Sequence, residues 1–291
     1  MFTAPKIPRA LLALYFLLVV QSVGIFAAFI YSVTTTDLRF GGDFITFWLR
    51  AVALVEGDLT RIYDMSVFDN VPPAGEAGAA NIYTVFPYPP TALHFLWPLG
   101  FFTLHGAMVV WLVLTGVFYL YAVFHSLEWQ KFRRIEPREK SLLVAFICLS
   151  PFVLSNVMTS QTGFLTGALL IFALTLLDRK PVLAGICMGL LCFKPQLGML
   201  LPFALIAGRY YKAFLSAACT TALLTVAAVW LWGESLWFEY PAYLESFSAL
   251  VLQVPDLLIG LYCSLFHYTR QVMPLPLAAG LQGILIVCAI T

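Results

Sequence analysis

The chain has 291 residues, of which 61% are hydrophobic and 11% charged, and its mean hydropathy is +0.90. Soluble domains carry roughly a quarter charged residues, so this composition excludes an ordinary soluble enzyme and predicts an all-α, polytopic transmembrane helical protein. The formal net charge of +1, without a basic tract interleaved with aromatic residues, gives no indication of a nucleic-acid partner.

Apolar stretches of about 20 residues predict about eight membrane segments in a single integral membrane domain covering residues 1–291. The first runs from Ala10 to Val33 and is too long for a signal-peptide core. The last begins at Pro274 and ends without flanking charges, which is typical of a C-terminally truncated chain. The other segments are expected near 105–127, 141–157, 164–177, 182–193, 197–208 and 213–232.

Most lysines and arginines lie on one side of these segments, in the N-terminus, the loop 128–140 and two short connections. The positive-inside rule makes that side cytoplasmic. Two long loops, 34–104 with interfacial helices and 233–273, are therefore expected outside. The chain is predicted to be a multi-pass protein of the plasma (inner) membrane with a cytoplasmic N-terminus.

Residues 39–64 form a polar region beside the first apolar segment. A helix is expected at Phe44–Glu56, lying in the membrane interface with Arg50 on its polar side and ending at Gly57. Asp43 occupies the N-cap position, where an aspartate accepts hydrogen bonds from backbone N–H groups. The two glycines before it allow close approach of a ligand. The residues alone therefore leave both a capping and a catalytic role open for Asp43.

Lys194 lies at a turn between two short apolar arms, 182–193 and 197–208. Arms of about 12 residues reach only about 18 Å, less than the ~30 Å hydrocarbon core. A charge at that depth is tolerated inside protein or in a wet cavity, so Lys194 is predicted to point into a cavity open to the outside, with Pro195 breaking the helix. The alternative is a tilted hairpin whose lysine extends to the interface.

Other polar residues are weaker candidates. Pro90 suits the first turn of a short helix, before which Tyr88 would join an interfacial aromatic belt. His94 in that helix is more typical of a structural histidine than of a base. The turn around Gln161 carries no charge. Cysteines inside apolar segments indicate hydrophobic packing, and no metal-ligand spacing is present.

Four stretches in this order resemble glycosyltransferase family 87, the polyprenyl-phosphate-mannose-dependent mannosyltransferase-like membrane proteins. The similarity runs from the first helix to about Arg209 and fades beyond Gly233. It implies a GT-C fold, a lipid-linked sugar donor, inversion at the sugar carbon, and a catalytic acid in the first outer loop, which falls on Asp43. The stretches are GGDFITFWLRAVALVEGDLTRIYD, VFPYPPTALHFLWPLG, SQTGFLTGALL and AGICMGLLCFKPQLGMLLPFALIAGR.

With such a donor, Asp43 would act as general base on the acceptor hydroxyl. The leaving phosphate requires nearby cations, and the sugar requires polar partners. No cofactor is expected, and a requirement for a divalent metal is left open. The expected donor-binding residues are Lys194, then Arg50 and Arg61 behind it, Gln161, Gln196, and Tyr88 or His94 lining the pocket.

The resulting expectation is a hexosyltransferase that moves a hexose, mannose by analogy, from a polyprenyl-phosphate sugar donor to an acceptor. The acceptor is a glycan or glycolipid on the periplasmic or extracellular face, and membrane lipid surrounds the protein. One alternative is a transporter or flippase of lipid-linked sugar, since secondary transporters also use broken helices with polar tips. Another is an inactive, truncated relative that persists as a membrane assembly partner.

Overall fold

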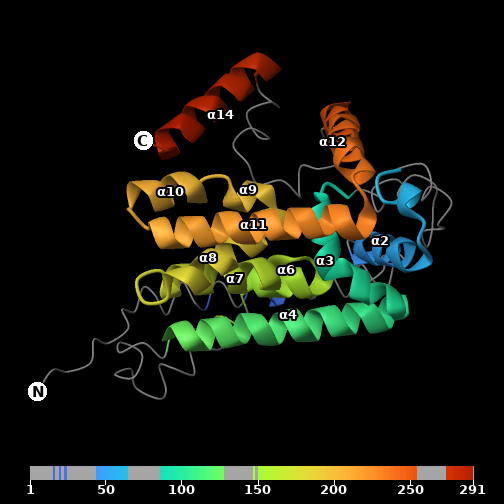
Figure 1. Ribbon diagram of the computed structural model, residues 1–291, viewed down its shortest axis with the longest axis horizontal. Coiled ribbons are helices and arrows are strands. Elements are labelled where there is room, and N and C mark those ends of the chain that lie inside the picture. Colours follow the sequence, from blue (N-terminus) through green and yellow to red (C-terminus); the bar gives the residue numbers. More distant parts are fainter. Residues whose placement is uncertain are drawn as a thin grey trace, which may run out of the picture.

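The computed structural model describes residues 16, 20, 23, 24, 44–64, 86–127, 147, 150–253 and 273–290. All regular secondary structure in this part is helical, as predicted. Four helices run along the long axis of the molecule, each packed against the next in a layered order (Figure 1). They are, in that order, α4 (Leu104–Leu127), α7 (Gly163–Leu176), α8 (Pro181–Leu190) and α11 (Tyr211–Trp232).

Shorter helices gather at one end of these four, where α4 and α7 begin and α11 ends (Figure 1). The described basic connections, 178–180 and 209–212, lie at the other end. The fold therefore separates the basic turns from the region around α2, as the loop charges predict. The elements at the first end are the short helices α2 (Phe44–Glu56), η1 (Leu59–Arg61), η4 (Pro90–Ala92), α3 (Leu93–Leu96) and η5 (Trp97–Phe101), together with the longer α12 (Ser235–Gln253).

Two helices in the described part are long and apolar enough to cross a membrane, Leu104–Ser126 and Tyr211–Trp232. Both expose large apolar side chains, including Leu114 on α4 and Trp230 on α11. A membrane would cover these side chains, whereas water would not. The remaining described helices are shorter, so the expected eight segments are not all found as full-length spans.

Glycines bring α8 and α11 into close contact. A Cβ atom added at Gly189 would lie 2.5 Å from the Thr220 Cβ, and one at Gly185 would lie 2.3 Å from the Ala213 carbonyl oxygen. Thr221 Oγ1 also donates a hydrogen bond to the Gly189 carbonyl at 3.4 Å. Small residues at such a contact let two helix backbones approach each other.

The hairpin that carries Lys194 is shorter than α11 beside it. Gly189 packs level with Thr220, and η7 (Leu191–Phe193) ends one turn later at Lys194. By contrast, α11 continues to Trp232, about 18 Å beyond Thr220. Figure 1 shows the following helix, α9 (Pro195–Gly198), short of the α12 end of α11. The predicted short hairpin is therefore present.

Several boundaries agree with the predicted ones. The helix expected at Phe44–Glu56 has those bounds, and Gly57 after it adopts a φ of +77°. Pro90 occupies the first turn of η4, and Pro89 before it is extended. The helices expected near 105–127, 182–193 and 213–232 correspond to α4, to α8 with η7, and to α11.

Prolines divide two segments that were expected to be continuous. Within the expected segment 141–157, α6 (Pro151–Thr159) begins at Pro151, and Ser150 caps its N-terminus. In 197–208, Pro202 starts a separate helix, α10 (Leu201–Ala207), after α9. Proline favours the first helical turn because it has no backbone N–H to donate there. The chain also forms the 19-residue helix α12 inside the expected loop 233–273, and α14 (Leu275–Ile290) near its end.

The expected polar face of α2 is also wrong. Thr46 and Arg50 would face water on a helix lying in the interface, but Arg50 is 0% exposed and Thr46 is buried as well. The exposed residues lie instead at the last turn, at Val55 and Glu56. This helix is packed into the protein, against η5 and α3.

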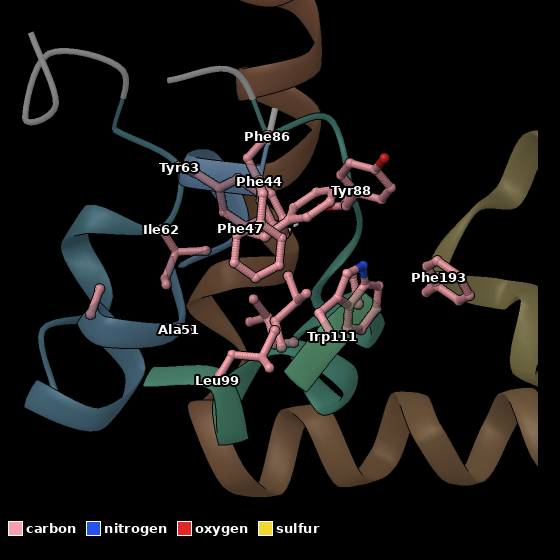
Figure 2. Close-up of a cluster of buried hydrophobic side chains, with 14 of the residues drawn as sticks. Phe44, Phe47, Ala51, Ile62, Tyr63, Phe86, Tyr88, Leu99, Trp111 and Phe193 are labelled. Atoms are coloured by element: carbon pink, nitrogen blue, oxygen red, sulfur yellow. Dashed lines mark hydrogen bonds between the residues drawn. The ribbon is translucent and has the colours of Figure 1, made fainter. Parts of the chain in front are cut away.

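Aromatic side chains form the core at the α2 end (Figure 2). The Phe47 ring packs edge-on against the rings of Phe86 and Tyr88, with centroids 6.4 and 5.4 Å apart, and lies 6.5 Å from Trp111. These residues come from α2, from the stretch before η4, and from α4. Their packing fixes the position of Tyr88 relative to the long helices.

Candidate functional site

Lys194 occupies the break between η7 and α9, where its backbone leaves the helical region with φ −133° and ψ 74°. Its Nζ donates a hydrogen bond to Thr162 Oγ1 at 3.0 Å and lies 6.0 Å from the centre of the Tyr88 ring. The side chain is half-buried. Among the residues that the structure describes, no carboxylate forms an ion pair with this ammonium.

Gln161 lies in the same group. Tyr88 Oη donates to Gln161 Oε1 at 3.5 Å, and Trp111 Nε1 donates to the Gln161 carbonyl at 3.4 Å. Three of the predicted donor-binding residues, Lys194, Tyr88 and Gln161, are therefore brought together from separate parts of the chain. Sequence reasoning missed Trp111, which had no polar neighbour in sequence to single it out.

The turn between α6 and α7 presents Gln161 and Thr162 to Lys194. Ser160 ends α6 in the left-handed region, with a φ of 51°, and its side chain is buried. Asn156 Oδ1 accepts a hydrogen bond from the Gly163 N–H at 2.8 Å. Sequence reasoning assigned no role to Thr162 or Asn156, although both lie in or beside the turn that it singled out.

A small cavity lies between this turn and the aromatic core, with a volume of about 10 Å³. That volume holds at most about one water molecule, so the cavity cannot hold a sugar ring. The cavity is lined by Phe47, Tyr88, Ala92, Phe95, Leu96, Trp111, Thr162 and Phe193.

The two arginines lie apart from Lys194. The Arg50 guanidinium is 5.6 Å from the centre of the Phe86 ring and donates to Thr46 Oγ1 at 2.9 Å and to the Ile62 carbonyl at 3.4 Å. Burial lowers the pKa of Arg50 to about 10, so it remains charged at neutral pH. Arg61 forms an ion pair of 2.7 Å with the exposed Glu56 at the end of α2.

His94 and Gln196 also lie in different surroundings. His94 Nε2 is 2.8 Å from the Leu224 carbonyl oxygen, and its ring lies 4.7 Å from that of Trp232, so it connects α3 to α11. The predicted role of His94 in lining the donor pocket stays a prediction. Gln196 is exposed in the first turn of α9.

Two buried tyrosines hold the stretch 86–88 in place. Tyr63 Oη donates to the Tyr88 carbonyl at 2.8 Å, and Tyr243 Oη, on α12, accepts a hydrogen bond from the Phe86 N–H. Burial raises the pKa of Tyr63 well above its ordinary value, so its hydroxyl remains a donor at physiological pH. The region after α2 and the helix α12 therefore meet at this stretch.

Asp43 lies outside the described residues, so its predicted role is not tested by the structure. The residue after it, Phe44, is the first residue of α2 and is 0% exposed. Its ring lies 6.3 Å from that of Phe47, which packs against Tyr88. The start of α2 therefore belongs to the aromatic core that contains Tyr88. The described residues include no group of three or more His, Cys, Asp or Glu side chains that could hold a metal ion.

The sequence model of glycosyltransferase family 87 matches residues 86–291. This chain belongs to glycosyltransferase family 87. It is therefore a membrane glycosyltransferase, which uses a sugar donor and an acceptor. The match includes Tyr88, Gln161 and Lys194. It also continues past Gly233, where the resemblance was expected to fade, while the stretch 39–64 lies outside it. No curated protein and no solved structure matches the chain significantly.

Proposed function

We propose that this family 87 protein transfers a hexose, mannose by analogy, from a polyprenyl-phosphate donor to a glycan or glycolipid acceptor. The observation that carries the proposal is the half-buried Lys194 ammonium, held against Thr162 and Tyr88 without a described carboxylate partner. A cation in such surroundings suits a negatively charged leaving group, since it is less screened there than in water.

The reaction follows from the charges. The acceptor hydroxyl attacks the anomeric carbon, the bond from that carbon to the phosphate oxygen breaks, and Lys194 stabilises the negative charge left on the phosphate. Asp43 accepts the proton of the acceptor hydroxyl as general base, and attack from the face opposite the phosphate inverts the sugar carbon. An aspartate with an ordinary pKa is a weak base, so the proton is transferred late, as the bond to phosphate breaks.

The site is assigned to the outer face of the plasma membrane, in a multi-pass GT-C-type protein whose N-terminus is cytoplasmic. This proposed orientation is supported by the positions of the basic connections relative to α2. The α2 region lies at one end of the long helices, and the described basic connections 178–180 and 209–212 lie at the other. The polyprenyl tail of the donor would remain in the bilayer beside the exposed apolar faces of α4 and α11.

The test is transfer of labelled mannose from a polyprenyl phosphate to membrane acceptors by wild type and Asp43→Asn. Asparagine caps a helix about as well as aspartate but cannot take a proton. Loss of about 10²- to 10⁴-fold in rate with normal membrane insertion is therefore expected. The matched control is Asp58→Asn, an exposed aspartate of the same region, which should retain the wild-type rate.

Full activity of Asp43→Asn would reject this base. Movement of the lipid-linked sugar across the membrane, without a new glycosidic bond, would instead support a flippase. An absence of transfer from any polyprenyl-phosphate hexose would reject the donor class.

A further inference from the structure

We propose that the N-terminus of α7, together with Lys194, Thr162 and Asn156, forms an anion-binding site for the phosphate of the lipid-linked donor. The inference rests on the proposed function and adds to it the groups that hold the phosphate. Neither α7 nor Asn156 was expected to take part from the sequence.

The fold places Lys194 beside the positive end of a helix. Its Nζ donates to Thr162 Oγ1, and Thr162 is the N-cap residue of α7, a helix of 14 residues. A helix N-terminus carries roughly half an elementary positive charge and bears N–H groups without intrahelical partners. Two positive potentials therefore meet where no described carboxylate pairs with the lysine. A bound anion would be attracted by both.

Thr162 adds a further donor. Its hydroxyl oxygen accepts the hydrogen bond from Lys194, and it makes no side-chain cap to the first turn of α7. A hydroxyl that accepts one hydrogen bond still has its own proton to donate. The hydroxyl and the ammonium thus both present donors at the start of α7.

Asn156 is an independent indication of a ligand. Its side chain is 8% exposed, and its Oδ1 accepts from Gly163, the first residue of α7, at 2.8 Å. Its Nδ2 is buried and has no hydrogen-bond partner in the part of the chain that the structure describes. Because Oδ1 and Nδ2 share one carbon, this unpartnered donor lies at the same helix end. Native proteins rarely leave such a buried donor without an acceptor.

Gly163 keeps the helix end accessible. The glycine itself is exposed, and a Cβ at this position would lie 2.3 Å from Asn156 Oδ1. Any other residue would displace the asparagine. The glycine therefore allows both the Asn156 contact and the approach of a ligand to the first turn of α7.

The charge of the site indicates the class of anion. One lysine and one helix end supply about one and a half positive charges, enough to balance the single negative charge of a phosphodiester. A diphosphate carries more charge and would need further cations. The site therefore fits a donor with a single phosphate between lipid and sugar.

Binding of a ten-carbon prenyl phosphate in the form of its methyl diester, which carries one negative charge, tests the site. It is measured by calorimetry on the purified full chain in lipid nanodiscs. Asn156→Asp keeps an acceptor for the Gly163 N–H but replaces the Nδ2 donor with a carboxylate oxygen that repels an anion. We expect affinity to fall at least about tenfold, with the melting temperature of the ligand-free protein retained. The control Ser155→Asp adds the same charge at an exposed neighbouring position and should bind as wild type.

Wild-type affinity in Asn156→Asp would overturn the proposal, as would equal binding of the prenyl alcohol that lacks phosphate. Competition by inorganic phosphate would support the anion site and show that it recognises phosphate without the lipid. If Asn156→Asp does not insert, Thr162→Val removes one hydroxyl at constant shape and should weaken binding about fivefold.

The same measurement separates this site from the catalytic proposal. Asp43→Asn is expected to bind the prenyl phosphate as wild type while losing transfer. An active Asp43→Asn would reject the base and leave the anion site standing. An active Asn156→Asp with unchanged affinity would reject the anion site and leave the transferase standing.

Discussion

Lys194 shows how an isolated charge can be held inside an apolar chain. Its half-buried ammonium has one hydroxyl partner, Thr162, and lies 6.0 Å from the Tyr88 ring centre, an arrangement in which the ring face attracts the cation. Neither contact neutralises the charge. Among the described residues no carboxylate compensates this charge, which is the basis for the proposed role of Lys194 in binding the donor phosphate.

Lys194→Gln should lower kcat/KM for the polyprenyl-phosphate donor by about 10²- to 10³-fold, because it removes the charge that stabilises the leaving phosphate. Steady-state transfer assays at varied donor concentration measure this. The matched control is Lys212→Gln, an exposed lysine at the first turn of α11, which should leave kcat/KM unchanged. An unchanged rate in Lys194→Gln would mean that the lysine serves only to position the hairpin.

At the residue scale, the sequence singled out side chains whose chemistry is unusual for their surroundings. Lys194 stood out as a charge in an apolar hairpin, and Tyr88 and Gln161 stood out through turn residues around them. Trp111 and Asn156 did not. They are placed beside the Lys194 turn by hydrogen bonds with Gln161 and Gly163, which lie 50 and 7 positions away, and no local sequence pattern records such contacts. Arg50 was predicted on the polar, water-facing side of α2 because the sequence pattern of a helix does not distinguish a buried arginine from an exposed one.

At the scale of helices, the contact between α8 and α11 determines how deep the Lys194 turn lies. Gly185 and Gly189 lie one turn apart and face α11 without room for a side chain. They align the short hairpin with the longer helix, so that the turn is reached well before α11 ends. The position of the lysine along α11 thus depends on two glycines at the contact between α8 and α11.

Gly189→Ala should lower the melting temperature by several degrees. Its Cβ would lie 2.5 Å from the Thr220 Cβ and 2.7 Å from the Ala217 carbonyl oxygen, so α8 must move away from α11. Overpacking of this kind costs about 1–3 kcal/mol, against a gain of about 1 kcal/mol in helix propensity. The matched control is Gly198→Ala, where the new Cβ has nothing within 4 Å. Equal melting temperatures for both variants would contradict this account.

Helix bounds were predicted correctly where a glycine ended the helix or where the apolar run was long. They were predicted less well where a proline inside an apolar run began a new helix. The bounds of α2 followed from Gly57, and α4 and α11 from their length. The starts of α6 and α10 were missed because an apolar run reads as one helix even when a proline within it begins another. The long helix α12 was missed since a polar-apolar stretch of its kind also fits a loop.

At the scale of the whole molecule, the described basic connections and the α2 region lie at opposite ends of the long helices. This separation predicts which end faces the cytoplasm. In a variant without native cysteines, Thr60→Cys should react with a membrane-impermeant maleimide on intact cells, because residue 60 is exposed near α2. Lys180→Cys, exposed in the connection before α8, should react only after the membrane is opened. Labelling of Lys180→Cys on intact cells, with Thr60→Cys protected, would reverse the topology and the assigned face of the site.

The hydrogen bonds of Tyr63 and Tyr243 have a mechanical consequence. Tyr63, after α2, donates to the Tyr88 carbonyl, and Tyr243 of α12 accepts from the Phe86 N–H, so two segments far apart in sequence hold the same short stretch. Prolines at positions 87 and 89 remove two backbone donors from that stretch, so the Phe86 N–H and the Tyr88 carbonyl carry its backbone contacts with these two tyrosines. Since the Tyr88 ring also lies 6.0 Å from the Lys194 Nζ, a displacement of either tyrosine would change the position of this ring beside the lysine.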